Sequence, residues 1–185
     1  MAPAPVGKAR PLPLRLDARL PRGLLHQPRP SGAEIHGSRP RLTDPAAPAP
    51  YTHHIQVGWG DCDPARIAYT ARLPWFALEA INGWWADALG EQAGWYHMEL
   101  DRGTGTPFVS MSMDFRAPVT PRHKLLCACW PTRLGTTSVS FRVEGRQDGT
   151  LCFEGDFTCV FIDSPSFTKK PPPEDIRALV EARIP

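Results

Sequence analysis

One short segment combines residue types that could act on a reactive carbonyl group. It comprises residues 59–69, WGDCDPARIAY, and lies between an alternating apolar run and a long aromatic run. Its second acid, Asp63, stands in a turn just before the expected start of a helix. A carboxylate there can hold a carbonyl group against the free amides and positive dipole end of the helix. Asp-Pro pairs also begin turns for structural reasons, because Asp bonds nearby backbone and Pro fixes φ.

The elements that must position this segment can be predicted from the spacing of apolar residues. In residues 51–60, apolar residues alternate with polar ones, which is typical of a strand. After a turn at residues 61–66, apolar residues recur at helical spacing as far as Leu89. Pro74 suits a first helical turn, so we expect the helix to begin at residues 70–73. The helix is apolar over most of its circumference, which predicts burial on several sides by a sheet that curls around it.

The remainder of the chain is predicted to be mostly strands. After a loop of Gly, Asp and Thr, strand-like runs cover residues 106–116, 124–134, 137–146 and 150–162, and a short helix covers residues 173–183. Gly135 and the pair Asp148-Gly149 mark turns between the last three strands. A strand, a long helix and then a meander of four strands give an α+β fold with an antiparallel sheet.

Composition and charge divide the chain of 185 residues into two parts. Residues 1–50 carry eight Lys/Arg, three Asp/Glu and eleven of the 22 prolines, so we expect a basic, Pro-rich, disordered leader. Residues 51–185 form the expected domain and carry a net charge of −3, within a net charge of +2 for the whole chain. No overall field therefore favours nucleic acid or a membrane surface as a partner.

Other kinds of site have weaker support in the sequence. The five cysteines form no Cys-x-x-Cys pair and are expected to be reduced thiols in a cytoplasmic protein. His53 and His54 are adjacent on a strand and face opposite ways, so a metal site is not expected. No Ser stands in a Gly-x-Ser-x-Gly elbow. The tryptophans of the helix, Trp75, Trp84 and Trp85, are expected in the core or in a subunit interface.

The segment around Asp63 resembles the hotdog-fold acyl-CoA thioesterases, in particular the 4-hydroxybenzoyl-CoA thioesterase type. In that family a strand runs into Gly-Asp-x-Asp-Pro-Ala-Gly-Ile-Val, followed by aromatic residues and a long central helix. Residues 60–65 and Ile67 match this motif, and residues 105–110, GTPFVS, resemble the opening of the family's second strand. The resemblance covers roughly residues 51–165. It implies a hotdog fold, an antiparallel sheet wrapped around a long central helix.

The resemblance also implies roles for individual residues. By position, Asp63 is the catalytic carboxylate, and Thr70 supplies the backbone N–H that polarises the thioester carbonyl. If the match is displaced by one residue, Tyr69 or Ala71 supplies that amide instead. Tyr69 and Arg66 are the expected substrate-binding residues. Arg66 replaces a family Gly, which implies a modified turn, an added cation facing the acyl group or CoA, or a solvated side chain.

The implied activity is hydrolysis of an acyl-CoA thioester to free acid and CoA. The acyl group is expected to be aromatic or of medium length, and Asp63 acts as nucleophile or general base. No cofactor is implied, and a homodimer or homotetramer is expected, with substrate contacting both subunits. A non-catalytic acyl-thioester binder or scaffold remains an alternative. A hotdog hydratase or dehydratase is disfavoured, because these use a His with an acidic partner and no His lies near residues 59–70.

Overall fold

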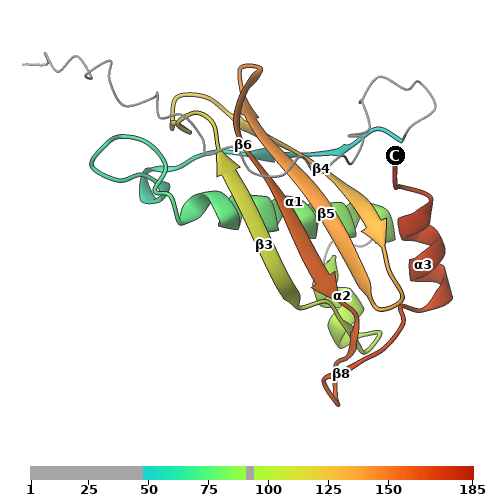
Figure 1. Ribbon diagram of the computed structural model, residues 1–185. Helices are drawn as coiled ribbons and strands as arrows, with labels where there is room; N and C mark the ends of the chain where they lie inside the picture. Colours follow the sequence, from blue (N-terminus) through green and yellow to red (C-terminus); the bar gives the residue numbers. More distant parts are fainter. Residues whose placement is uncertain (1–47, 91–93) are drawn as a thin grey trace, which may run out of the picture. The chain divides into compact units, whose positions relative to one another are not determined.

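The computed structural model describes residues 48–90 and 94–185. The chain divides into two units, residues 1–39 and 40–185, and every described residue belongs to the second unit. The leader expected at residues 1–50 therefore lies almost wholly outside the described residues. Figure 1 shows the described unit, in which a sheet lies against a long helix.

Five antiparallel strands form the main sheet in the order β1-β4-β5-β6-β3. These are β1 (Tyr51–Ile55), β3 (Phe108–Phe115), β4 (Leu125–Leu134), β5 (Ser138–Gln147) and β6 (Thr150–Val160). The turn between β5 and β6 has φ of 47° at Asp148 and 79° at Gly149. Positive φ at both central residues is what a two-residue hairpin turn needs, and Asp-Gly supplies it readily. The four predicted strands are present, with ends displaced by one or two residues, but only β4, β5 and β6 form a meander. The prediction that all four strands follow one another in the sheet is wrong, because β3 pairs with β6 instead of β4.

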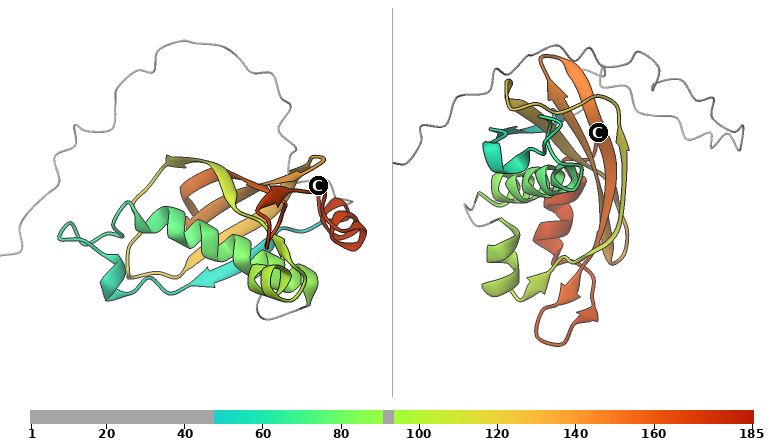
Figure 2. Two further views of the ribbon diagram at one scale, coloured as in Figure 1. Left: turned by 90° about the horizontal axis from the view of Figure 1, so that it is seen from below. Right: turned by 90° about the vertical axis from the view of Figure 1, so that its left-hand side faces the viewer.

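The long helix α1 (Arg72–Leu89) lies against one face of this sheet (Figure 2). Ala77 and Ala80 are completely buried. Their small side chains let the helix approach the strands closely. Trp85 packs edge-on against Phe141 of β5, with ring centroids 5.8 Å apart. Such edge-to-face pairs add stabilisation beyond the area that they bury. The predicted buried central helix and the α+β hotdog fold are confirmed.

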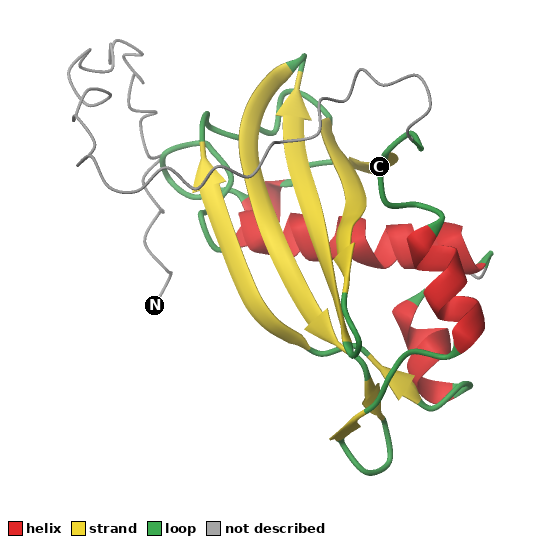
Figure 3. Cartoon of the chain, turned by 45° about the vertical axis from the view of Figure 1, so that its right-hand side comes forward, coloured by secondary structure: helices red, strands yellow, loops and turns green. Residues whose placement is uncertain are grey.

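Smaller elements close the end of the sheet where β3 begins (Figure 3). They are α2 (Trp95–Leu100) and a three-stranded sheet in the order β2-β7-β8, followed by α3 (Glu174–Glu181). The three short strands are β2 (Thr104–Gly105), β7 (Ile162–Asp163) and β8 (Thr168–Lys169). Helix α3 agrees with the prediction. The loop expected between α1 and β3 instead contains α2 and β2, which are too short to show a clear periodicity.

Strand β3 forms one edge of the main sheet. Within the described residues it pairs with β6 alone. Its large apolar side chains are exposed, with Val109 at 58%, Met111 at 55% and Phe115 at 50% of their accessible area. An unpaired edge with an apolar surface is a strand that another chain can extend. No helix among the described residues is long and apolar enough to cross a membrane.

Candidate active site

The loop that carries Asp63, residues 58–70, projects from the start of α1 (Figure 1). It begins with a single 3-10 turn, η1 (Trp59–Asp61), and is closed by an antiparallel bridge between Cys62 and Ala68. The Asp63 amide donates to the Ile67 carbonyl at 3.0 Å, and the Ala68 amide donates to the Val119 carbonyl at 2.7 Å. Backbone hydrogen bonds therefore determine the shape of this Asp63 loop and join it to the rest of the domain.

Asp63 is half-buried and only one of its carboxylate oxygens has a partner. The Ala65 amide donates to Asp63 Oδ1 at 2.8 Å, which is the turn geometry that an Asp-Pro pair favours. Within the described residues, Asp63 Oδ2 accepts no hydrogen bond. One oxygen of Asp63 therefore stabilises the turn. The other is available to a bound molecule.

Asp61, by contrast, uses both of its carboxylate oxygens within the protein. The Gly58 amide donates to Oδ2 at 2.8 Å, and Arg72 Nε donates to Oδ1 at 2.7 Å. A second guanidinium nitrogen of Arg72 lies 2.5 Å from Oδ1, and the Asp61 side chain is 15% exposed. The Arg72 guanidinium also lies 5.9 Å from the Trp75 ring centroid. Asp61 is thus a turn former that fixes the Asp63 loop to the first residue of α1.

The start of α1 leaves two backbone amides without partners. The Arg72 amide donates to the Tyr69 carbonyl at 2.7 Å, and the Leu73 amide donates to the Thr70 carbonyl at 3.2 Å. The third helical residue is Pro74, which has no N–H. Among the described residues, nothing accepts a hydrogen bond from the amides of Thr70 and Ala71. These two exposed donors are therefore available at the positive end of the helix dipole.

Tyr69, unlike Thr70 and Ala71, has a backbone amide that is already paired. Its amide donates to the Asp61 carbonyl at 2.8 Å, so its N–H is already used within the loop. Its side chain is 56% exposed, and that of Trp59 is 95% exposed. Both rings belong to the Asp63 loop and expose apolar surface. Of the three amides that could polarise a carbonyl, only those of Thr70 and Ala71 are unpaired.

Arg66 keeps the backbone conformation that a Gly would favour. Its φ is 66°, in the left-handed region, and its amide donates to the Asp63 carbonyl at 2.9 Å. The turn therefore keeps its left-handed conformation although Arg66 stands where the family has Gly, and this conformation costs about 1–2 kcal/mol for a residue with a side chain. Its side chain is exposed and forms no ion pair within the described residues. The site thus has a solvent-facing cation on the loop that carries the Asp63 carboxylate.

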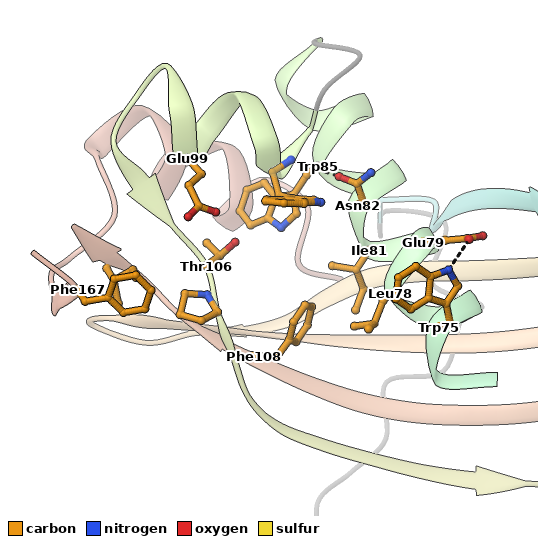
Figure 4. A pocket seen from close by; sticks show the side chains of 13 residues that line it. Trp75, Leu78, Glu79, Ile81, Asn82, Trp85, Glu99, Thr106, Phe108 and Phe167 are labelled. Carbon is orange, nitrogen blue, oxygen red and sulfur yellow. Dashed lines mark hydrogen bonds between the residues drawn. The ribbon is translucent and has the colours of Figure 1, made fainter. Parts of the chain in front are cut away.

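A cavity of about 440 Å³ lies farther along α1, and sequence reasoning did not find it. It is bounded by α1, α2, the residues that lead into β3, and the β7-β8 hairpin (Figure 4). Trp75 and Trp85, expected in the core or an interface, both line it. The sequence signal was the spacing of Trp75, Leu78, Asn82 and Trp85, which places them on one face of the helix. We expected the tryptophans in the core or in an interface, because α2, the opposite wall of the cavity, was not predicted.

Asp63 does not line this cavity. Its lining starts on α1 at Trp75, which is one helical turn beyond Ala71. In the described chain, no hydrogen bond or ion pair joins the Asp63 side chain to Arg66, Tyr69 or Thr70. The Asp63 loop and the cavity are therefore separate features, connected by the first turn of α1.

Other nucleophiles and ligands have less favourable surroundings. Burial and the carboxylates of Asp61 and Asp63 raise the pKa of Cys62, so its thiol stays protonated and is a poor nucleophile. Burial raises the pKa of Cys127 to about 12. No group of three His, Cys, Asp or Glu residues in the described ranges could hold a metal ion.

His53 faces α1 rather than the Asp63 loop. Its Nδ1 lies 3.3 Å from the Tyr51 hydroxyl, and burial lowers its pKa. A Cβ atom on Gly83 would lie 2.9 Å from this Nδ1 and 2.6 Å from the Tyr51 hydroxyl, so Gly83 is what allows β1 to pack closely on the helix. His53 therefore serves the packing of β1 against α1.

Comparison with known families and structures gives consistent results. Residues 57–180 match a family model described as the thioesterase-like superfamily. A crystal structure of a thioesterase superfamily protein from Jannaschia sp. CCS1 is 56% identical, covers 78% of this chain and 99% of that chain, and has a TM-score of 0.72. A search of curated proteins found no match.

More distant solved structures share the fold. A 1,4-dihydroxy-2-naphthoyl-CoA thioesterase from Synechocystis is 22% identical, with a TM-score of 0.63 over 70% of this chain and 94% of that chain. A gentisyl-coenzyme A thioesterase is 21% identical, with a TM-score of 0.61 over 70% of this chain and 99% of that chain. At these identities, the likeness establishes the fold alone.

Proposed function

The chain belongs to the thioesterase-like superfamily, and we propose on that premise that it hydrolyses an acyl-CoA thioester, with Asp63 as the catalytic carboxylate. The family supports a thioester hydrolase in general. One observation carries the assignment to Asp63: it keeps an unpaired carboxylate oxygen in a loop tied to the start of α1, where the amides of Thr70 and Ala71 are also unpaired. A carboxylate and free amide donors are the two components that thioester hydrolysis needs.

Two chemical routes fit this arrangement. In the first, Asp63 attacks the thioester carbon, the C–S bond breaks, CoA leaves as a thiolate that takes a proton from water, and water hydrolyses the resulting anhydride. In the second, Asp63 takes a proton from a water molecule that attacks the carbonyl directly, the C–S bond breaks, and the leaving CoA thiolate takes the proton from Asp63. In both routes the negative charge that develops on the carbonyl oxygen is stabilised by the Thr70 amide. One such donor contributes about 3 kcal/mol in the transition state.

We propose that Tyr69 and Arg66 bind the substrate at the mouth of the site. The exposed Tyr69 ring offers apolar surface next to the free amides, and the unpaired Arg66 guanidinium is suited to a phosphate group of CoA. The acyl group is proposed to be aromatic or of medium length. The naphthoyl-CoA and gentisyl-CoA thioesterases with this fold act on aromatic acyl groups, but they are too distant to determine the substrate here.

We propose a homodimer or homotetramer as the working form. The support is the exposed edge of β3, whose apolar side chains Val109, Met111 and Phe115 lie at the surface of the described chain. Antiparallel pairing of two β3 strands about a twofold axis would join two sheets and cover these side chains. We further propose that substrate contacts both subunits of this oligomer.

A non-catalytic acyl-thioester binder is the alternative, and one observation favours it. Asp63 does not line the cavity, so a binder could use the cavity without the Asp63 loop. The left-handed φ at Arg66 favours the enzyme, because the loop keeps the backbone conformation of the family's Gly although Arg66 stands in its place.

The test is release of CoA thiol from a panel of acyl-CoAs by the wild type and by Asp63→Asn. The Asn side chain keeps the oxygen that accepts the Ala65 amide, so the thermal midpoint should stay unchanged. We expect kcat/KM to fall at least 100-fold, as when a catalytic base is lost. Asp148→Asn is the matched control, an exposed acid in a turn with positive φ, and should leave the rate unchanged. Equal rates in Asp63→Asn and the wild type would remove Asp63 from the mechanism, and no release from any acyl-CoA would favour the binder.

A further inference from the structure

The cavity beside α1 is aligned with the free amides at the helix start. Trp75, Leu78, Asn82 and Trp85 line it, and their spacing of three, four and three residues places them on one helical face. Ala71 precedes Trp75 by four residues and so lies on the same face. A group bound to the free Ala71 or Thr70 amide therefore stands at one end of a stripe that leads directly into the cavity.

The length of this stripe sets the size of its occupant. From Ala71 to Asn82, the cavity-lining position before Trp85 on this face, the helix rises about 17 Å, and from Ala71 to Trp75 about 6 Å, at 1.5 Å per residue. A saturated carbon chain advances about 1.25 Å per bond, from the C–C bond length and tetrahedral angle. A chain whose carbonyl is held at Ala71 therefore enters the cavity after about five carbons and needs about ten to fourteen carbons to occupy it. A single aromatic ring would end near Trp75.

The walls are apolar, and the charged groups among them are all acidic. Leu78, Ile81, Trp85, Phe108 and Ile162 supply aliphatic and aromatic surface, and neither Lys nor Arg lines the cavity. The acid on α1, Glu79, accepts a hydrogen bond from Trp75 Nε1 at 2.8 Å and points away from the cavity in Figure 4. Apolar walls of this kind favour a hydrocarbon chain.

The far end of the cavity has a different character. The Glu99 carboxylate of α2 points toward the space between Trp85 and Thr106 (Figure 4), and it has no hydrogen-bond partner among the described residues. A negative charge at the end of the cavity repels a second negative charge. It therefore discriminates against an acyl chain that ends in a carboxylate and leaves one that ends in a methyl group unaffected.

From these observations we infer that the cavity binds a linear, saturated acyl chain of about ten to fourteen carbons whose far end is uncharged, with Thr106 and Glu99 as specificity-determining residues. This inference rests on the proposed function, because it takes the thioester to be held at the start of α1. It selects the aliphatic class from the two acyl classes that the proposed function leaves open.

The first experiment compares saturated acyl-CoAs from four to eighteen carbons with benzoyl-CoA and dodecanedioyl-CoA. We expect kcat/KM to rise about tenfold for each two carbons up to the optimum, from the burial of each methylene. Dodecanedioyl-CoA should react at least tenfold more slowly than dodecanoyl-CoA. A maximum at benzoyl-CoA, or a rate that does not depend on chain length, would overturn the inference.

Two variants then test the far end of the cavity. Thr106→Phe places a ring there and should shorten the preferred chain by two or more carbons, so that the rate on butyryl-CoA relative to dodecanoyl-CoA rises at least tenfold. Thr150→Phe, at an exposed position of β6 outside the cavity, is the matched control and should keep the wild-type profile. Glu99→Gln keeps the shape of the side chain and removes its charge, so it should raise the rate on dodecanedioyl-CoA relative to dodecanoyl-CoA at least tenfold. Unchanged profiles in both variants would overturn the inference.

The two proposals can fail separately. If Asp63→Asn abolishes hydrolysis while Thr106→Phe and Glu99→Gln change nothing, the assignment of the cavity is wrong and the proposed function stands. If the wild type hydrolyses no acyl-CoA, tryptophan fluorescence still reports binding, since Trp75, Trp85 and Trp95 line the cavity. Dodecanoyl-CoA binding that Thr106→Phe weakens would then support the cavity assignment alone, and no binding would overturn it.

Discussion

The Asp63 loop and the strand meander are stabilised in opposite ways. In the meander, the side chains of Phe141, Val143, Phe153 and Phe157 are completely buried. In the loop, Trp59 is 95% exposed and the conformation depends on backbone hydrogen bonds and one ion pair. Apolar burial therefore stabilises the strands, whereas hydrogen bonds and the Asp61–Arg72 ion pair determine the shape of the loop and join it to the domain. It follows that the polar groups of the loop can serve chemistry with little effect on the stability of the domain.

The largest effect on stability is expected in the meander. Phe141→Ala removes a completely buried ring that contacts Trp84 and Trp85, and should lower the free energy of unfolding by about 3–5 kcal/mol. Urea denaturation measures this change. Activity per folded molecule on butyryl-CoA, whose chain is too short to reach Trp85, should stay near that of the wild type, because the ring packs on Trp84 and Trp85 and not at the start of α1. Lost activity in fully folded Phe141→Ala protein would show that the two regions are not independent.

A smaller effect, divided between stability and activity, is expected where the regions meet. Arg72→Gln removes the ion pair that fixes Asp61 to the start of α1 and should lower the free energy of unfolding by about 1 kcal/mol. Because the loop would then be less well positioned, we also expect kcat/KM to fall about tenfold. Arg122→Gln, at an exposed position without an ion pair in the described ranges, is the control. Unchanged kcat/KM in Arg72→Gln would mean that this ion pair does not position the site.

A change in stability of the opposite sign is expected at Arg66, with the smallest effect on activity. Arg66→Gly places the residue best suited to φ of 66° in the turn, and should raise the free energy of unfolding by about 1 kcal/mol. Thermal denaturation measures this gain, and a loss of stability would contradict the backbone argument. The KM for acyl-CoA then reports on the side chain: an increase means that Arg66 contacts substrate, and no change means that it is solvated.

The same contrast explains what the sequence could predict. The buried helix and the strands β3, β4, β5 and β6 are long enough to show their periods, and Asp148-Gly149 has an unambiguous turn signature, so their positions along the chain were predicted closely. The place of β3 beside β6 was not predicted, because it depends on pairing between segments distant in the sequence. Helix α2 and strands β2, β7 and β8 have six residues or fewer, and they form through contacts with distant segments. The cavity depends on α2 packing near α1, so it could not be predicted either. The motif distinguishes Asp63 from Asp61. Only the structure shows that Asp63 has an oxygen without a hydrogen bond in the described chain, whereas both oxygens of Asp61 accept hydrogen bonds.

The most direct test of the central claim is a crystal structure of Asp63→Asn with a bound acyl-CoA that the wild type hydrolyses. The account predicts the thioester carbon within about 3.5 Å of the side chain at position 63. It also predicts the carbonyl oxygen about 3 Å from the amide nitrogen of Thr70 or Ala71. A thioester bound away from the start of α1, with no contact to position 63, would contradict the account.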